Sequence, residues 1–213
     1  MRFLDRRLLI GAIATAAVLG AAALGLTSCG PKGGTVTAED MTMGNAKAPV
    51  TLTEYASVAC PHCARFNNTV FPDFKKKYID TGKVYYVSRE MLTGDPRLAA
   101  AGFLLARCAG KDKYFAVTDA IYRRQEEMYA GDARGVLLSI AKSVGMSDSA
   151  FEKCISDEKS LNALNDRVGK YAEAKINSTP TFVVGDQRIE GEVTLQQLDD
   201  LVAGKKMPKP AEE

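Results

Sequence analysis

The stretch "EYASVACPHCARF", residues 54–66, places two cysteines two residues apart, with a proline and a histidine between them. Side chains over residues 49–57 alternate between apolar and polar, which predicts a strand. Over residues 63–78 the apolar side chains recur every three or four positions, as on one face of a helix. Pro72 should kink or interrupt that helix. The cysteine pair therefore lies where a strand passes into a helix. It could bind a metal, crosslink the fold or exchange electrons.

After Gly82, residues 83–92 return to β-branched and aromatic side chains. The order strand, helix, strand favours a parallel unit with a right-handed crossover. Residues 93–176 are almost wholly helical in pattern. Breaks in this helical block are expected near Gly110, Gly131, Gly145 and Asp157.

The last part of the chain predicts two short strands over residues 179–191, joined by a turn at Gly185-Asp186. A final helix over residues 194–204 should begin at a Thr194 cap and end at Gly204. The block of helices thus separates two groups of strands, and we expect one α/β unit with a helical insertion.

The cysteine pair suits dithiol chemistry. Cys60 and Cys63 share a helix face, and Pro61 is tolerated in the first turn, so Cys60 should lie at the helix start. Unpaired N–H groups and the helix dipole favour an anion there, which lowers the pKa of the thiol. His62 would add a donor, and a positive charge when protonated. A stabilised thiolate makes the disulfide the stronger oxidant.

Two other interpretations of the pair compete with redox chemistry. Zinc needs about four ligands, whereas His62 is the only histidine and the remaining cysteines are isolated. A structural disulfide across C-x-x-C would close too small a loop to stabilise the fold much. The lone histidine also excludes a multi-histidine metal site, and it excludes a Ser–His or Cys–His hydrolase unless His62 is its base.

The start of the chain indicates export. Residues 1–28 combine three arginines with an apolar run over 8–26, which is typical of a signal segment. Leu26-Thr27-Ser28-Cys29 resembles the lipobox of bacterial lipoproteins, in which the cysteine, here Cys29, is acylated. An uncleaved membrane anchor is the alternative. Residues 29–48 are predicted to form a flexible tether, and residues 205–213 a disordered tail.

Charge and cysteine content fit an exported domain. The chain carries a formal charge of +2, all of it accounted for by residues 1–28, so no basic surface for nucleic acid is expected. Five cysteines leave four if Cys29 takes lipid. Cys108 and Cys154 then either form a structural disulfide, worth roughly 4 kcal/mol in the chain-entropy model, or remain two buried thiols.

Two segments, "APVTLTEYASVACPHC" (48–63) and "STPTFVVGDQRIEG" (178–191), with the helical block between them, resemble the bacterial DsbA-type thiol–disulfide oxidoreductases of the thioredoxin superfamily. The resemblance implies an α/β thioredoxin-like fold, with its core in residues 49–92 and 177–204. An all-helical subdomain, residues 93–176, would be inserted into that core.

The resemblance also assigns roles to particular residues. Cys60 would be the exposed nucleophile and Cys63 the resolving cysteine. Pro180, by pattern alone a strand-entry proline, would be a cis-proline, with Thr179 contacting the sulfurs. Glu54 would be a buried acid that assists proton transfer; the alternative is a half-exposed strand residue.

In familiar members of the family a lysine on the next strand pairs with this acid. At the matching position this sequence has Val84 in place of a lysine.

We therefore expect a monomer that donates disulfides to reduced or unfolded exported proteins in the periplasm or cell envelope, tethered to the membrane. It should need no bound cofactor or metal, and a DsbB- or VKOR-like membrane protein should reoxidise it. The alternatives are an isomerase or reductase of the same superfamily, and a non-enzymatic, chaperone-like lipoprotein that binds through the groove beside Pro180.

Overall fold

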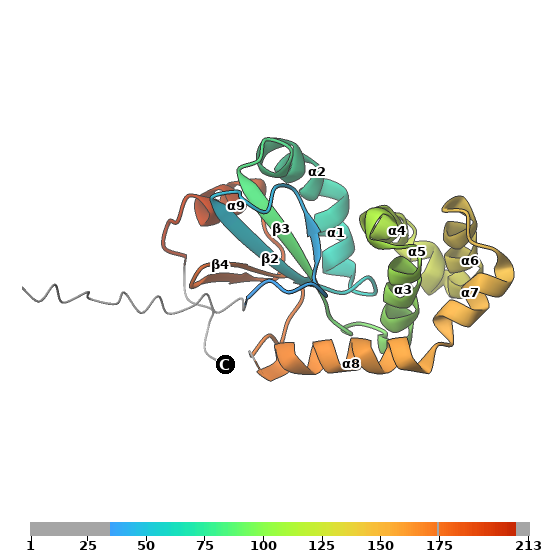
Figure 1. The fold of residues 1–213 in the computed structure, drawn as a ribbon. Helices are drawn as coiled ribbons and strands as arrows, with labels where there is room; N and C mark the ends of the chain where they lie inside the picture. The colour runs from blue at the N-terminus through green and yellow to red at the C-terminus, as the bar shows by residue number, and fades with distance from the viewer. Residues whose placement is uncertain (1–34, 174, 208–213) are drawn as a thin grey trace, which may run out of the picture.

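The computed structural model describes residues 35–173 and 175–207. Within them, a mixed sheet has the strand order β1-β3-β2-β4-β5 (Figure 1). The strands are β1 (Met41–Met43), β2 (Val50–Ala56), β3 (Val84–Glu90), β4 (Thr181–Val184) and β5 (Gln187–Glu190). The β2–β3 pair is parallel and the other pairs are antiparallel. The α/β fold predicted from the sequence is confirmed, with every predicted strand in place.

The crossover between β2 and β3 is an interrupted helix, as predicted. It consists of α1 (Pro61–Thr69), α2 (Phe71–Phe74) and the π-helix η1 (Lys75–Ile79). Pro72 occupies the first turn of α2, where its missing N–H breaks no helical bond.

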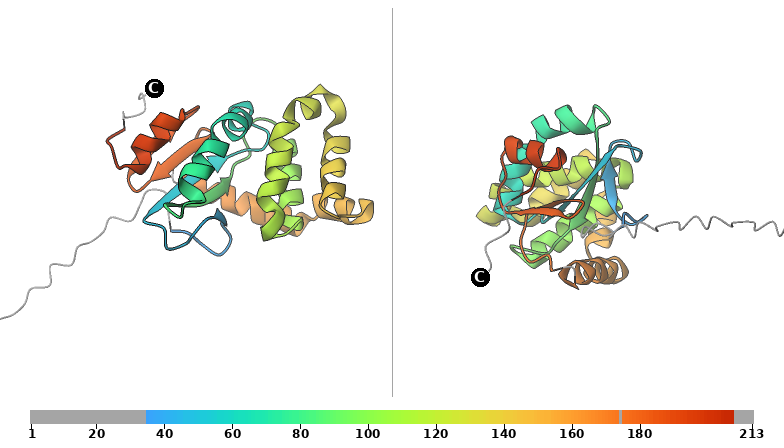
Figure 2. Two further views of the ribbon diagram at one scale, coloured as in Figure 1. Left: turned by 90° about the horizontal axis from the view of Figure 1, so that it is seen from above. Right: turned by 90° about the vertical axis from the view of Figure 1, so that its left-hand side faces the viewer.

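The helical insertion follows β3 and lies at one end of the sheet, as Figure 1 and the left view of Figure 2 show. Its elements are α3 (Pro96–Cys108), α4 (Lys111–Arg123), α5 (Gln125–Glu127), η2 (Met128–Asp132), α6 (Ala133–Ser143), α7 (Asp148–Ile155) and α8 (Glu158–Glu173). The predicted breaks are confirmed. At Gly110, for example, φ is +92°, a conformation that only glycine adopts readily.

The core consists mainly of two large clusters of buried apolar side chains. The sheet cluster joins β2, β3 and β4 to α1, α2 and α9 (Leu195–Val202), which begins at a Thr194 capping box as predicted. The second cluster fills the helical insertion and also contains Cys60 and Cys63. The cysteine pair therefore lies at the junction between the sheet and the helical insertion.

Covalent and ionic links hold the insertion in place. Cys108 and Cys154 form a disulfide between α3 and α7 with an S–S distance of 2.10 Å, which confirms the bridge. Glu90, buried at the end of β3, accepts hydrogen bonds from Arg107 at 2.6 Å and from Arg167 at 2.9 Å. Because these arginines come from α3 and α8, one carboxylate ties both helices to the sheet.

The tether predicted over residues 29–48 is wrong in part. Met41–Met43 forms the edge strand β1 against β3. Asp40 is buried, and Arg89 Nε lies 3.1 Å from one of its carboxylate oxygens. The sequence pattern missed this strand because it is short and is fixed by an ion pair with a residue 49 positions away.

The disordered tail predicted over residues 205–213 is also wrong in part. The backbone N–H of Met207 donates to the side chain of Gln187 at 3.0 Å. The predicted signal segment, Cys29 and residues 208–213 lie outside the described residues. Among the helices that the structure describes, none is long and apolar enough to cross a membrane.

Candidate active site

Cys60 lies at the N-terminus of α1, as predicted. Its backbone is extended, with φ −89° and ψ 123°, and Pro61 follows as the first helical residue. Cys60 is therefore the N-cap, whose position leaves the first backbone N–H groups of the helix directed toward its side chain. Cys63 follows on the same face of the helix, and neither cysteine is in a disulfide. The structure thus shows the dithiol form.

The two thiols are both buried but differ in proton affinity. Cys60 is 6% exposed, which contradicts the predicted exposed sulfur, and Cys63 is fully buried. The pKa of Cys60 falls from 9.0 to about 5, first because the Cys63 thiol donates to its sulfur. Burial opposes the shift, while the Thr179 side chain and the backbone N–H groups of Cys63 and His62 support it. The pKa of Cys63 rises well above its usual value, mainly through burial.

The Thr179–Pro180 peptide bond is cis, as predicted, and its loop faces the nucleophilic sulfur. The Cys60 thiol donates to the carbonyl oxygen of Thr179 at 3.4 Å. The hydroxyls of Thr179 and Thr93 share a hydrogen bond of 2.5 Å, so the segment after β3 fixes this loop. On its other side, the N–H of Gly191 donates to the carbonyl of Pro180 at 2.8 Å. Thr93 had no signal in the sequence.

Glu54 is buried on β2, as the resemblance implied, and its pKa is raised from 4.5 to about 7. Burial is the main cause; a hydrogen bond from the Tyr86 hydroxyl opposes the shift, and the charge of Cys60 adds to it. Val84, where the family's lysine was placed, pairs with Val50 and not with Glu54. The partner of the acid is therefore Tyr86, a neutral donor on β3.

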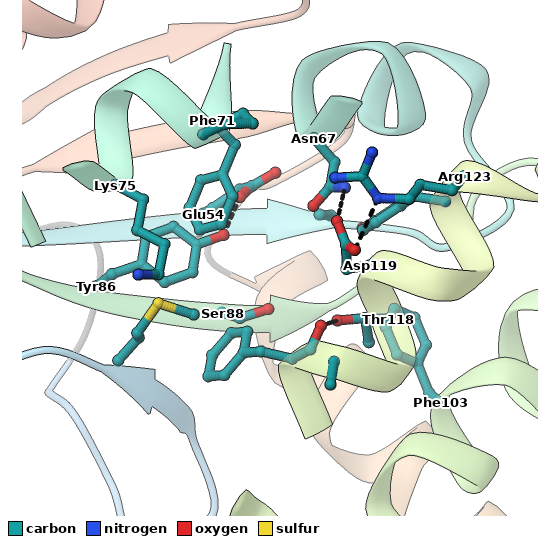
Figure 3. Close-up of a pocket in the computed structure, with 16 residues that line it drawn as sticks. Glu54, Asn67, Phe71, Lys75, Tyr86, Ser88, Phe103, Thr118, Asp119 and Arg123 are labelled. Atoms are coloured by element: carbon teal, nitrogen blue, oxygen red, sulfur yellow. Dashed lines mark hydrogen bonds and ion pairs between the residues drawn. The ribbon is translucent and has the colours of Figure 1, made fainter. Parts of the chain in front are cut away.

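Glu54 and Tyr86 lie in the wall of a cavity of about 340 Å³ (Figure 3). Much of its lining is aromatic, with Phe71, Tyr86, Phe103, Phe115 and Tyr122 among its residues. On another side, Asp119 accepts hydrogen bonds from Asn67 at 2.9 Å and from Arg123 at 2.8 Å. Glu54 therefore borders a cavity between the sheet and α4 that is lined by both aromatic and polar side chains.

The side chain of His62 does not lie where the sequence argument put it. Its imidazole is more than half exposed, and Nδ1 contacts Oε1 of Glu192. Arg65 Nη1 lies 2.5 Å from the same carboxylate oxygen. The expected donor to the Cys60 sulfur is therefore the backbone N–H of His62, not its ring. Glu192, 130 positions along the chain, carried no signal in the sequence.

This fold and this site define a class: a thioredoxin-like protein with an asymmetric dithiol opposite a cis-proline. A family model described as thioredoxin matches residues 36–203, and the chain belongs to the thioredoxin family. Among solved structures, α-DsbA1 of Wolbachia pipientis has a TM-score of 0.72 and 27% identity, over 79% of this chain and 92% of that one. BdbD of Bacillus subtilis has a TM-score of 0.70 and 21% identity, over 83% and 96%, and supports the fold alone.

A curated relative from Rickettsia bellii, provisionally named a protein-disulfide oxidoreductase, is 34% identical over 154 residues. A relative from Rickettsia typhi with a similar provisional name is 37% identical over the same length. The match covers 71% of this chain and 59% and 56% of these relatives. The chain thus spans less than two thirds of their length. The fold is DsbA-like, with the predicted helical subdomain inserted into a thioredoxin-like core.

Proposed function

We propose that this protein is a DsbA-type thiol–disulfide oxidoreductase that acts as an oxidase and transfers the Cys60–Cys63 disulfide to reduced proteins. The observation that carries the proposal is the placement of Cys60 as the N-cap of α1, against the cis-proline loop, with Cys63 fully buried on the same helix. This placement lowers the pKa of Cys60 and raises that of Cys63. A cysteine that is ionised near neutral pH is a good leaving group. Its stabilised thiolate lowers the free energy of the reduced protein, so the oxidised protein tends to give its disulfide away.

The exchange has two steps. A substrate thiolate attacks the Cys60 sulfur, the Cys60–Cys63 bond breaks, and its electron pair passes to Cys63. A second substrate thiolate then attacks the substrate sulfur of the mixed disulfide, and Cys60 leaves as a thiolate. The substrate loses two electrons and gains a disulfide, while the protein is reduced to the dithiol that the structure shows.

A proton must reach Cys63 when it leaves, because its raised pKa makes it a thiol in the reduced protein. We assign this proton to Glu54, whose pKa of about 7 lets it both give and take a proton near neutral pH. The charge of Glu54 is one of the causes that raise the pKa of Cys63, so the two groups are close enough to interact. Glu54 is only 4% exposed, so the acid has little contact with bulk water.

We propose the periplasm or cell envelope as the location, on the basis of the signal-like residues 1–28. Either acylation of Cys29 or an uncleaved anchor would tether the protein to the membrane. The substrates would be reduced or unfolded exported proteins, and a DsbB- or VKOR-like membrane protein would restore the disulfide. A Bacillus cereus relative provisionally named disulfide bond formation protein D, 35% identical over 106 residues, supports a role in disulfide formation.

The test uses the oxidised protein and a reduced, unfolded substrate with two cysteines, with no other oxidant present. We expect stoichiometric transfer of one disulfide. A Cys63→Ala variant, mixed with the disulfide-bonded form of the substrate, should accumulate a mixed disulfide: the Cys60 thiolate opens the substrate disulfide, one substrate cysteine leaves as a thiolate, and no Cys63 thiol is present to resolve the product. Mass spectrometry under non-reducing conditions identifies this species.

The double variant Cys60→Ser/Cys63→Ser is the control, since it should transfer nothing while remaining folded. If the double variant still promoted folding as well as the wild type, the protein would be a binding protein and the proposal would be wrong. If the oxidised wild type transferred no disulfide, whereas its dithiol form reduced the disulfide-bonded substrate, the protein would be a reductase.

A further inference from the structure

The loop over residues 57–60 leads from β2 into α1, and hydrogen bonds from backbone and side-chain groups fix its conformation. Within the loop, the N–H of Cys60 donates to the carbonyl of Ser57 at 3.0 Å and the N–H of Ala59 donates to the Ser57 hydroxyl at 3.2 Å. The Ser57 hydroxyl in turn donates to the carbonyl of Thr93 at 2.7 Å. The conformation that presents the Cys60 sulfur is thus fixed from the sheet side.

The other side of this loop is held by the helical insertion. Gln125 Nε2 donates to the carbonyl of Val58 at 2.8 Å and to that of Cys60 at 3.2 Å. The hydroxyl of Tyr129 donates to the carbonyl of Ala59 at 2.5 Å. Three consecutive carbonyls, ending at the nucleophile itself, therefore accept from two side chains spaced four residues apart on α5 and η2.

The environment makes these hydrogen bonds strong constraints. Val58 and Ala59 are fully buried and Gln125 is 5% exposed, so a carbonyl that lost its donor would have little water to replace it. The Cys60 carbonyl also accepts the first helical bond, from the N–H of Ala64 at 3.1 Å. Gln125 thus acts on the peptide group that joins the N-cap to the helix.

We propose that Gln125 and Tyr129 are positioning residues that hold Cys60 at the start of α1, so that the helical insertion controls how readily this thiol becomes a thiolate. The proposal rests on the proposed function only in taking Cys60 as the reactive thiol. The physical reason is geometric: the N–H groups of His62 and Cys63 stabilise the sulfur only while the N-cap conformation persists. Release of the carbonyls would let the N-cap fray.

The test uses the full-length protein with Gln125→Met, which removes the donor but keeps the length of the side chain, and Tyr129→Phe, which removes only the hydroxyl. The ionisation of Cys60 is followed by the ultraviolet absorbance of the thiolate against pH, with a Cys60→Ser variant as the blank. We expect each substitution to lower the acid dissociation constant of Cys60 by about three- to tenfold, the range that corresponds to one net hydrogen bond. The equilibrium constant with glutathione should shift toward the disulfide in the same variants.

Arg124→Ala is the matched control, because Arg124 binds Glu127 and Ser139 from the same segment but does not contact the loop over residues 57–60. It should change the dissociation constant by less than about twofold. Unchanged ionisation in folded Tyr129→Phe would overturn the proposal, even if Gln125→Met failed to fold. An equal shift in Arg124→Ala would also overturn it, because the effect would then be general loosening.

These outcomes are distinct from a failure of the proposed function. A wild-type protein that proved to be a reductase would refute the oxidase assignment. The difference in Cys60 ionisation between the variants and the wild type would still decide the role of Gln125 and Tyr129.

Discussion

The depressed pKa of Cys60 predicts that the reduced protein becomes less stable as the pH falls from neutral toward 5. A thiol whose pKa is lower in the folded state than in the unfolded state stabilises the fold above the unfolded value. That contribution is lost as the pH falls through the folded value. With a pKa of about 5 in the folded protein and 9.0 as the ordinary value, the window runs from pH 9 down to pH 5.

The magnitude follows from these two values. Each pKa unit corresponds to about 1.4 kcal/mol, so the ionised Cys60 contributes about 3 kcal/mol at pH 7, two units above its folded pKa and two below its unfolded one. At pH 5, where the folded thiol is half protonated, the contribution falls to about 0.4 kcal/mol. The reduced protein should therefore lose about 2 to 3 kcal/mol between the two pH values through this group alone.

Urea unfolding of the reduced wild type and of Cys60→Ser, each at pH 7 and pH 5, isolates the effect. The serine variant lacks the titrating thiol but retains the other ionisable groups, so the difference between the two proteins leaves only the contribution of Cys60 and of its coupling to Glu54. We expect the wild type to exceed the variant in stability at pH 7 by about 2 to 3 kcal/mol more than at pH 5. A difference that does not change with pH would refute the account of the thiolate.

Three further predictions concern residues around the site. Replacing Cys108 and Cys154 together with alanine should lower the free energy of unfolding by about 4 kcal/mol, because their bridge has a sequence separation of 46 residues; urea unfolding measures this, and a loss below about 1 kcal/mol would contradict it. Glu90→Gln should cost about 3 to 5 kcal/mol in the same assay, since two buried or half-buried arginines lose their counter-charge; unchanged stability would show that the cluster is not needed. Glu54→Gln should slow reoxidation of the dithiol by about a hundredfold at neutral pH, because Cys63 loses its proton acceptor. Stopped-flow kinetics measures this rate, and a rate equal to that of the wild type would remove Glu54 from the mechanism.

Local patterns in the sequence were sufficient to predict most of the fold. Alternation over residues 49–57 and a period of three to four over residues 63–78 are set by near neighbours, and the structure places β2 and α1 there. Pro61 and Thr194 mark helix starts for reasons that operate within one turn. The position of Cys60 at the start of α1, which explains the lowered pKa of its thiol, was predictable in the same way.

The long-range partners of the site were not predictable. Glu192, which takes the ring of His62 away from the sulfur, is separated from it by 130 positions. Gln125 is one of several consecutive polar residues in the helical block, and nothing in the sequence distinguishes it from a solvent-exposed glutamine. The cis peptide at Pro180 was inferred only through resemblance, because an X-Pro bond carries no local mark of its isomer. These features depend on how the helical insertion and the sheet pack, which periodicity does not encode.

The most direct test of the central claim is the redox equilibrium of the Cys60–Cys63 pair in graded glutathione buffers. We predict a potential well above that of the glutathione couple, so that the pair is reduced by a small excess of reduced glutathione. A potential close to that of thioredoxin would contradict it, because the thiolate at the start of α1 would then not be stabilised enough to make the disulfide a donor.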